Sequence, residues 1–240
     1  MNGSSIKRIA AVTMFIDHIG AAFFYIFTSQ YDGMQDFAGA DIIYDILRII
    51  GRSAFPLFCF LLVEGFLHTR SVKKYAARLL LFAAISEVPF DLAFYDSVWN
   101  MQMQNVFFTL FFGVCAMWSL HQCKKLQDPA VAKTKWCMAA GWIGALLCVL
   151  AAHVLQTDYG AVGVVVILVL YLLRQDRILS CIAGYGAICF VGGELWCFPA
   201  FLLLPWYNGE KGKSNKYFFY VFYPAHILLL AGIRILYLKG

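Results

Sequence analysis

The sequence has little charge and no long polar segment. Only 14% of its 240 residues are Asp, Glu, Lys or Arg, whereas 62% are hydrophobic and 17% are aromatic. A soluble domain usually carries about 25% charged and about 45–50% apolar residues. The composition therefore predicts a polytopic membrane protein. The lack of a long polar stretch predicts one domain, residues 1–240.

Several other signals are absent. The eight cysteines form no CxxC pair and no Cys/His spacing, so we expect packing thiols rather than a disulfide framework or a structural metal. We find no internal repeat, which weakens the case for a secondary transporter. The first apolar run does not resemble a cleaved signal, because Asp17 and His18 lie within it.

The apolar runs predict membrane-spanning helices. Lipid offers the backbone no hydrogen-bond partner, so each run should form a helix of roughly 17–25 residues. We expect an all-α, polytopic integral membrane helical bundle with about nine transmembrane helices (roughly 8–10). The candidate spans are 9–28, 44–67, 73–94, 104–122, 137–155, 159–174, 178–193, 195–207 and 217–238. Pro199 and Pro205 interrupt the eighth, where a re-entrant or broken helix is the alternative.

Of the 19 Lys and Arg residues, 15 occur on one side of this arrangement. Basic clusters precede the first span and separate the second from the third, the fourth from the fifth, the sixth from the seventh and the eighth from the ninth. The opposite connections, 29–43, 95–103, 156–158 and 193–194, contain no Lys or Arg. The positive-inside rule then predicts a protein of the cell (plasma) membrane with a cytoplasmic N-terminus, and nine spans put the C-terminus outside.

Ionisable side chains lie inside the expected spans, where an Asp costs roughly 3 kcal/mol on insertion scales. Asp17 and His18 lie midway through the first span, Arg52 lies in the second, Glu87 in the third and His226 in the ninth. At a rise of about 1.5 Å per residue, both histidines and the arginine fall at similar depth. Such residues are candidates for a functional site, and helix packing is the alternative role.

The histidine of the first span has a plausible chemistry. A pKa near neutral makes His18 a natural proton acceptor for an attacking amine or hydroxyl. Adjacent helix residues point about 100° apart, so Asp17 and His18 should face different partners. We expect a carboxylate, from Glu87 or from Asp17 itself, to raise the basicity of His18.

Polar residues near the span ends are candidates for substrate binding. They are Glu64, Asp91, Gln104, Asn105, Asp158 and Tyr159. Those at the outer ends would line a vestibule. Contact with lipid headgroups is the alternative for Glu64 and Asp91, and capping of the helix that follows is the alternative for Asp158.

The stretch LHTRSVKKYAAR, residues 67–78, is strongly basic. One interpretation is topology and anionic-lipid binding. The other is a site for the phosphates of a cytosolic nucleotide-bearing donor, because Arg and Lys form charge-assisted bonds with phosphate. The residues assigned to this site are Arg70, Lys73, Lys74 and Arg78.

Seven motifs resemble, in order, those of the TraX family. They are KRIAAVTMFIDHIGAAFF, LRIIGRSAFPLFCFLLVEGFLHTRSVKKYAARLL, ISEVPFDLAF, QNVFFTL, DYGAVGV, YNGEKG and YFFYVFYPAHILLL. They leave mainly 29–46, 123–157 and 175–205 unmatched. The family's name-giving member is associated with N-terminal acetylation of a conjugative pilin subunit. That substrate does not carry over to this chain.

The TraX family is also similar to a wider group of membrane acyltransferases that use cytosolic acyl-CoA. The first-span histidine essential to that group matches His18, and its final-span histidine motif matches His226. The resemblance implies an acetyltransferase with acetyl-CoA as donor and His18 as general base or transient acyl carrier. Asp17 would orient the site, and Arg52 would balance negative charge.

The expected partners are membrane lipid, acyl-CoA and a peptide, sugar or lipid acceptor. We expect no nucleic acid, because topology accounts for the basic residues. Two alternatives remain open. A proton-coupled transporter or flippase would use the same Asp, His and Glu side chains as a relay. A non-catalytic assembly factor for a surface structure would use them only to fix helix packing.

Overall fold

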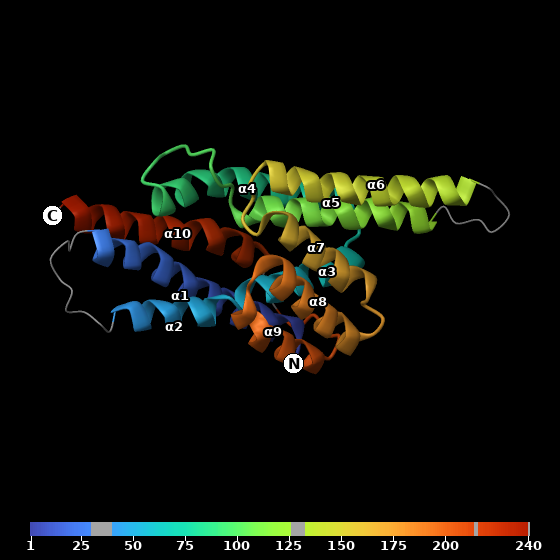
Figure 1. Ribbon diagram of the computed structural model, residues 1–240, viewed down its shortest axis with the longest axis horizontal. Coiled ribbons are helices and arrows are strands. Elements are labelled where there is room, and N and C mark those ends of the chain that lie inside the picture. Colours follow the sequence, from blue (N-terminus) through green and yellow to red (C-terminus); the bar gives the residue numbers. More distant parts are fainter. Residues whose placement is uncertain (30–39, 126–132, 214–215, 240) are drawn as a thin grey trace. The chain divides into compact units, whose positions relative to one another are not determined.

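The computed structural model describes residues 1–29, 40–125, 133–213 and 216–239, and its regular secondary structure there is helical (Figure 1). These ranges contain no β-strand beyond an isolated bridge between Gln104 and Thr157. The all-α prediction is confirmed. The elements are α1 Gly3–Ser29, α2 Ala40–Gly51, α3 Ala54–His68, α4 Val72–Phe94, α5 Val106–Lys125, α6 Lys133–Val154, α7 Gly160–Leu172, α8 Arg177–Gly192, η1 Leu195–Cys197, α9 Phe198–Leu203, η2 Leu204–Trp206 and α10 Lys216–Lys239.

Four described stretches of helix are long and apolar enough to cross a membrane: Ile42–His68, Val106–Cys123, Trp136–Val154 and Tyr217–Leu236. The chain is therefore a membrane protein. Three further apolar helical stretches are shorter: Gly160–Leu172, Arg177–Gly192 and Leu195–Trp206. Helices α1 and α4 are also long, but they are not among these stretches. The count of about nine crossing helices stays a prediction beyond these four.

The second expected span is not one continuous helix. Residues 44–67 were expected to form a single helix, but α2 ends at Gly51 and α3 begins at Ala54. Pro56 explains the break, because a proline lacks the N–H that would bond the carbonyl four residues earlier, at Arg52, and its ring clashes with that carbonyl. Arg52 therefore lies in a turn in the middle of an apolar stretch.

The eighth expected span is broken, as the alternative for it foresaw. A short 3₁₀ turn, η1, leads into the six-residue helix α9, and a second 3₁₀ turn, η2, follows. Pro199 lies in the first turn of α9 and Pro205 in η2. Each proline is tolerated there because the first residues of a helix need no N–H partner within it.

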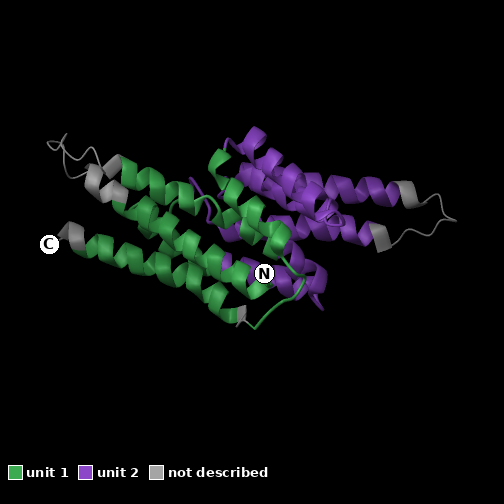
Figure 2. Cartoon of the chain, turned by 90° about the horizontal axis from the view of Figure 1, so that it is seen from below, with its two compact units in different colours: residues 1–61, 84–100, 194–240 green, residues 62–83, 101–193 purple. Residues whose placement is uncertain are grey.

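The chain forms two compact units, each assembled from separate segments (Figure 2). Unit 1 comprises residues 1–61, 84–100 and 194–240, and unit 2 comprises 62–83 and 101–193. Within unit 1, α1 packs against α2 and α10. Within unit 2, α5 packs against α6 and α7, and α7 against α8. Helices α3 and α4 contribute residues to both units.

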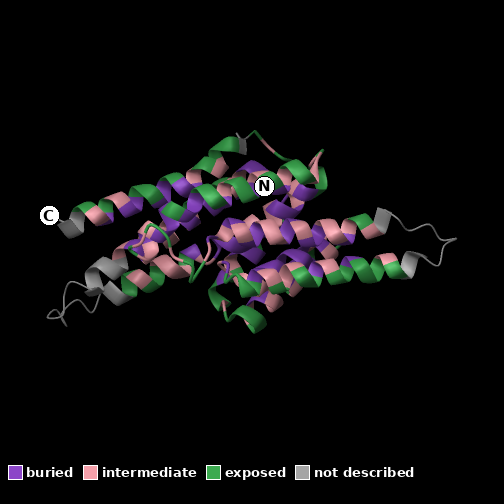
Figure 3. Cartoon of the chain, turned by 90° about the horizontal axis from the view of Figure 1, so that it is seen from above, coloured by how far each residue is buried: buried purple, intermediate pink, exposed green. Residues whose placement is uncertain are grey.

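Small residues allow α5 and α6 to pack closely. The Ser119 hydroxyl donates to the Gly141 carbonyl at 3.1 Å, and a Cβ on Gly144 would lie 2.2 Å from the Ser119 oxygen. The opposite face of α6 is open, since only 17% of Trp136–Val154 is buried (Figure 3). Close approach through Gly, Ala and Ser is typical of helix pairs in membranes.

Buried polar contacts fix the start of α5. The Asn105 side chain is fully buried; its oxygen accepts from the Phe107 N–H at 3.1 Å and its nitrogen donates to the Ala83 carbonyl at 2.8 Å. Asn105 therefore caps α5 and ties it to α4 within unit 2.

The interpretation of Asp158 as a helix cap is wrong. The residue that caps α7 is Tyr159, in a left-handed conformation with φ of 61° and no side-chain capping bond. The Asp158 backbone instead bonds to the start of α5: its N–H donates to the Gln104 carbonyl at 2.8 Å, and its carbonyl accepts from the Thr109 hydroxyl.

Replacing Asn105 with alanine should lower the free energy of unfolding by about 1–2 kcal/mol, because the cap is lost and the Ala83 carbonyl loses its side-chain donor. Asn105→Ser should recover part of this loss, since serine also caps but is too short to reach Ala83. Thermal unfolding of the detergent-solubilised protein measures both. Equal stability of the alanine variant and the parent would contradict this role.

Candidate functional site

Two histidines from opposite ends of the sequence meet in unit 1. His18 of α1 and His226 of α10 lie with Nδ1 of the first 2.6 Å from Nε2 of the second. Their rings are nearly parallel, with centroids 4.9 Å apart and planes within 11° of each other. His226 is buried, with 4% of its surface exposed. The structure thus joins two residues that sequence reasoning had placed only at similar depth.

The hydrogen bonds assign the protons of this pair. Nδ1 of His226 lies 2.6 Å from the Phe222 carbonyl, which can only accept, so this nitrogen carries the hydrogen. In neutral His226 the other nitrogen, Nε2, then accepts from Nδ1–H of His18. Nε2 of His18 then carries a lone pair, and no described residue donates a hydrogen bond to it. That lone pair is what a general base or a nucleophile requires.

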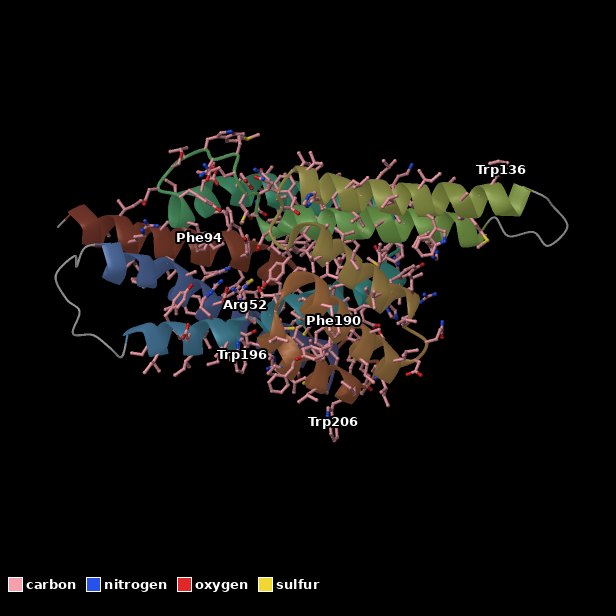
Figure 4. All side chains as sticks on the ribbon, in the orientation of Figure 1. Arg52, Phe94, Trp136, Phe190, Trp196 and Trp206 are labelled. Carbon is pink, nitrogen blue, oxygen red and sulfur yellow. The ribbon has the colours of Figure 1, made fainter. Side chains whose placement is uncertain are left out.

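Aromatic rings surround the histidine pair. Phe94 and Tyr223 each present an edge to His18, with centroids 5.7 and 5.8 Å away. Phe15 and Phe222 contact His226. Figure 4 labels Phe94, the last residue of α4. These rings give the pair a largely apolar surrounding, in which an electrostatic interaction is stronger than it would be in water.

Two ion pairs lie in the same unit. Asp17 accepts from Arg48 at 2.7 Å, and Arg52, labelled in Figure 4, pairs with Glu194 at 3.0 Å. The side chains are about a quarter exposed or less. Asp17 lies close enough to interact electrostatically with Arg52 and Glu194 as well as with Arg48. The two pairs therefore form one neutral cluster that links α1, α2 and the start of η1.

The expected carboxylate partner of His18 is not found. Among the described residues, the hydrogen-bond partner of His18 is His226, so neither Asp17 nor Glu87 has this role. Asp17 precedes His18 and points about 100° away from it around the helix, which brings Asp17 to Arg48 of α2. Glu87 is buried in α4, as is Asp91, whose carboxylate accepts from the Asn100 N–H at 2.7 Å.

Unit 2 contains a polar pocket of about 460 Å³ at the start of α4. Arg70 and Lys73 line it, together with Ser71, Trp118 and His121. Two of the four basic residues assigned to phosphate binding are therefore in the pocket. Lys74 is exposed and does not line it, and Arg78 lies over the Tyr75 ring, 5.9 Å from its centroid.

The electrostatics of this pocket favour an anion. Ser71 precedes α4, and its hydroxyl accepts from the Lys74 N–H at 3.4 Å. The first turn of α4 contains no acidic residue but does contain Lys73 and Lys74. A helix N-terminus carries partial positive charge, and lysines there add to it rather than offset it. A phosphate group is the ligand that such a site prefers.

The residues assigned to substrate binding are divided between the units. Asp91 belongs to unit 1, whereas Glu64, Gln104, Asn105, Asp158 and Tyr159 belong to unit 2. Asn105 has a structural role as the cap of α5. Binding of a substrate by any of the six stays a prediction.

Sequence reasoning missed three residues. Glu194 was seen only as an acid in a connection, yet it pairs with Arg52. His121 lines the pocket and contacts the Tyr171 hydroxyl at 3.3 Å. Arg234, in α10, is 2% exposed and donates to the Ala93 carbonyl at 2.6 Å. The signal for His121 and Arg234 was available, because each is an ionisable residue in an apolar run.

Two comparisons with known proteins give a match. The family described as TraX protein matches residues 2–234. A relative described as probable fimbrial assembly protein FimC, serogroup H1, from Dichelobacter nodosus is 30% identical over 256 residues, covering 95% of this chain and 94% of the relative. No solved structure matches.

The proton assignment can be tested by ¹⁵N NMR of the imidazole nitrogens. We expect protonated Nδ1 and unprotonated Nε2 in both rings at neutral pH. The Phe222 carbonyl fixes the tautomer of His226, and His226 then fixes the tautomer of His18. His226→Ala should release His18 into a mixture of tautomers. A protonated Nε2 on His18 in the parent protein would contradict the assignment.

Proposed function

The chain belongs to the TraX family, and from that premise we propose that it is an integral membrane acyltransferase. It moves an acetyl group from cytosolic acetyl-CoA to an amine or hydroxyl of an acceptor at or across the membrane. The observation that supports this chemistry best is the histidine pair, which leaves Nε2 of His18 with a free lone pair in an apolar setting.

In this proposal, His18 acts as the general base. Its Nε2 takes the proton from the acceptor as the acceptor nitrogen or oxygen attacks the thioester carbonyl, and it returns the proton to the departing CoA sulfur. His226 stabilises the resulting imidazolium, because its Nε2 continues to accept from Nδ1–H of His18. Alternatively, Nε2 attacks the thioester carbonyl itself, the C–S bond breaks to release CoA as a thiolate, and the imidazole carries the acetyl group until the acceptor attacks it.

The pocket of unit 2 is proposed to hold the donor's phosphates. Arg70 and Lys73 supply charge-assisted hydrogen bonds, and the first turn of α4 adds its partial positive charge. Trp118 and Phe66 line the same pocket and offer apolar surface to the rest of a nucleotide. Lys74 and Arg78 contribute long-range positive charge rather than direct contacts.

The charged cluster beside the histidines is assigned a supporting role. Sequence reasoning assigned Arg52 to balance negative charge, but Arg52 pairs with Glu194 and Arg48 pairs with Asp17. The cluster is therefore neutral, and its proposed role is to hold α1, α2 and η1 in place beside the histidines. We place the N-terminus in the cytoplasm, in agreement with the alternation of the basic connections.

A non-catalytic role in assembly is the second candidate. The relative from Dichelobacter nodosus is described as a probable fimbrial assembly protein. In this role, the ion pairs and the histidine pair would only hold helices together. It predicts that a folded His18→Ala variant keeps its function. A transporter or flippase would instead move its substrate unchanged and depend on a pH gradient.

The first test is turnover of radiolabelled acetyl-CoA by the purified protein without an acceptor. We expect slow release of CoA, reduced about 10²–10⁴-fold in His18→Ala, because a general base contributes that much. His226→Gln keeps an acceptor for Nδ1–H of His18 and should retain more activity than His226→Ala. Stable labelling of the parent protein would favour an acetylated intermediate. Absence of turnover in folded parent protein would contradict the proposal.

The second test concerns the donor site. Arg70→Glu combined with Lys73→Glu should raise the Kd for CoA roughly 10–100-fold, because each charge-assisted bond to phosphate is lost and repulsion replaces it. Isothermal titration with CoA measures the change. Lys213→Glu, which reverses an exposed charge of unit 1, is the matched control. Equal weakening by the control would point to general electrostatics rather than to this pocket.

A further inference from the structure

The segment that follows α4, residues 95–100 (YDSVWN), displays large apolar side chains. Val98 is 64% exposed and Trp99 is 66% exposed. An exposed tryptophan beside an exposed valine is unfavourable in water unless another apolar surface covers them. We refer to residues 95–100 as the 95–100 loop.

This loop is held by many hydrogen bonds. The Asn100 N–H donates to the buried Asp91 carboxylate at 2.7 Å, and the Tyr95 and Ser97 N–H groups donate to the Asp91 carbonyl at 2.9 and 3.4 Å. The Ser97 hydroxyl donates to the Trp99 carbonyl at 2.9 Å and accepts from the Trp99 N–H at 3.2 Å. The loop therefore presents Val98 and Trp99 in a fixed position.

A buried arginine attaches the loop to the end of a membrane span. Arg234 of α10 donates to the Ala93 carbonyl at 2.6 Å and forms an ion pair with Asp96. Its side chain is 2% exposed, whereas that of Asp96 is 52% exposed. Arg234 lies two residues before the end of the span Tyr217–Leu236. This contact holds the loop beside the C-terminal end of that apolar stretch.

From this geometry we propose that the 95–100 loop is an interfacial anchor, with Val98 and Trp99 inserted at the boundary between the lipid headgroups and the hydrocarbon. Tryptophan is enriched at this depth because it combines an apolar ring with one polar N–H. The loop contains no Lys or Arg, so its partner is the zwitterionic bilayer surface rather than anionic headgroups.

The anchor has a consequence for the histidine pair. Phe94, the residue before the loop, presents its edge to His18. A loop fixed at the interface therefore also fixes the end of α4, and with it one wall of the site, at a constant depth. This role does not depend on the acyl transfer proposed above, since it concerns only the bilayer.

The test uses the full chain labelled with 5-fluorotryptophan in phosphatidylcholine nanodiscs, with the Trp99 ¹⁹F signal assigned by its loss in Trp99→Phe. Spin-labelled lipids carry the label either near the headgroup or near the end of the acyl chain. We expect the shallow label to broaden Trp99 more than the deep one. Trp142, exposed within the span Trp136–Val154, is the internal control and should show the opposite order.

The remaining outcomes overturn the proposal. Broadening of Trp99 only by a water-soluble gadolinium chelate would place the loop in solvent. Broadening by none of the probes would mean that protein, such as a second copy, covers it.

A second experiment uses Asp96→Asn. This variant removes the negative charge that pairs with Arg234 but keeps a residue that tolerates the positive φ, 51°, at this position. In this variant, Trp99 should lose its preference for the shallow label. An unchanged preference would show that Arg234 does not set the depth.

Discussion

Polar groups within apolar helices must find their partners inside the chain, and unit 1 is built around this constraint. Lipid cannot hydrogen-bond a carboxylate or a guanidinium, so an unpaired charge there is costly. Asp17 therefore meets Arg48, Arg52 meets Glu194 and His18 meets His226. These contacts join segments from the first helix to the last. Removal of one partner costs more than the pair contributes, because the other charge stays buried and unpaired.

The backbone is adapted to let these partners meet. A Cβ on Gly51 would lie 2.2 Å from the Cβ of Asp17, so only glycine allows α2 to approach α1 closely enough for Arg48 to reach the carboxylate. Pro56 interrupts the helix one turn later and leaves Arg52 in a turn. The broken helix, the close approach and the ion pairs are thus parts of one local arrangement.

The two units offer different chemical environments. The histidine pair of unit 1 lies among aromatic rings, where a neutral imidazole with a fixed tautomer is favoured over a charged one. The pocket of unit 2 contains two cations and the N-terminus of α4, which favours a phosphate. The acyl transfer that we propose would use both properties: an uncharged base for the proton, and a positive site for the nucleotide end of the donor.

The sequence by itself determined the helical class, the membrane environment and most helix positions, because hydrophobic runs in lipid have few alternatives to a helix. It also marked His18, Asp17, Arg52 and His226 as unusual, because charge within an apolar run is costly wherever it points. Only the tertiary structure decided how these residues pair. Glu194 follows Arg52 by 142 positions and His226 follows His18 by 208. The partner of each arginine or imidazole depends on how helices that are distant in the sequence pack together. The local periodicity of the sequence does not record that packing.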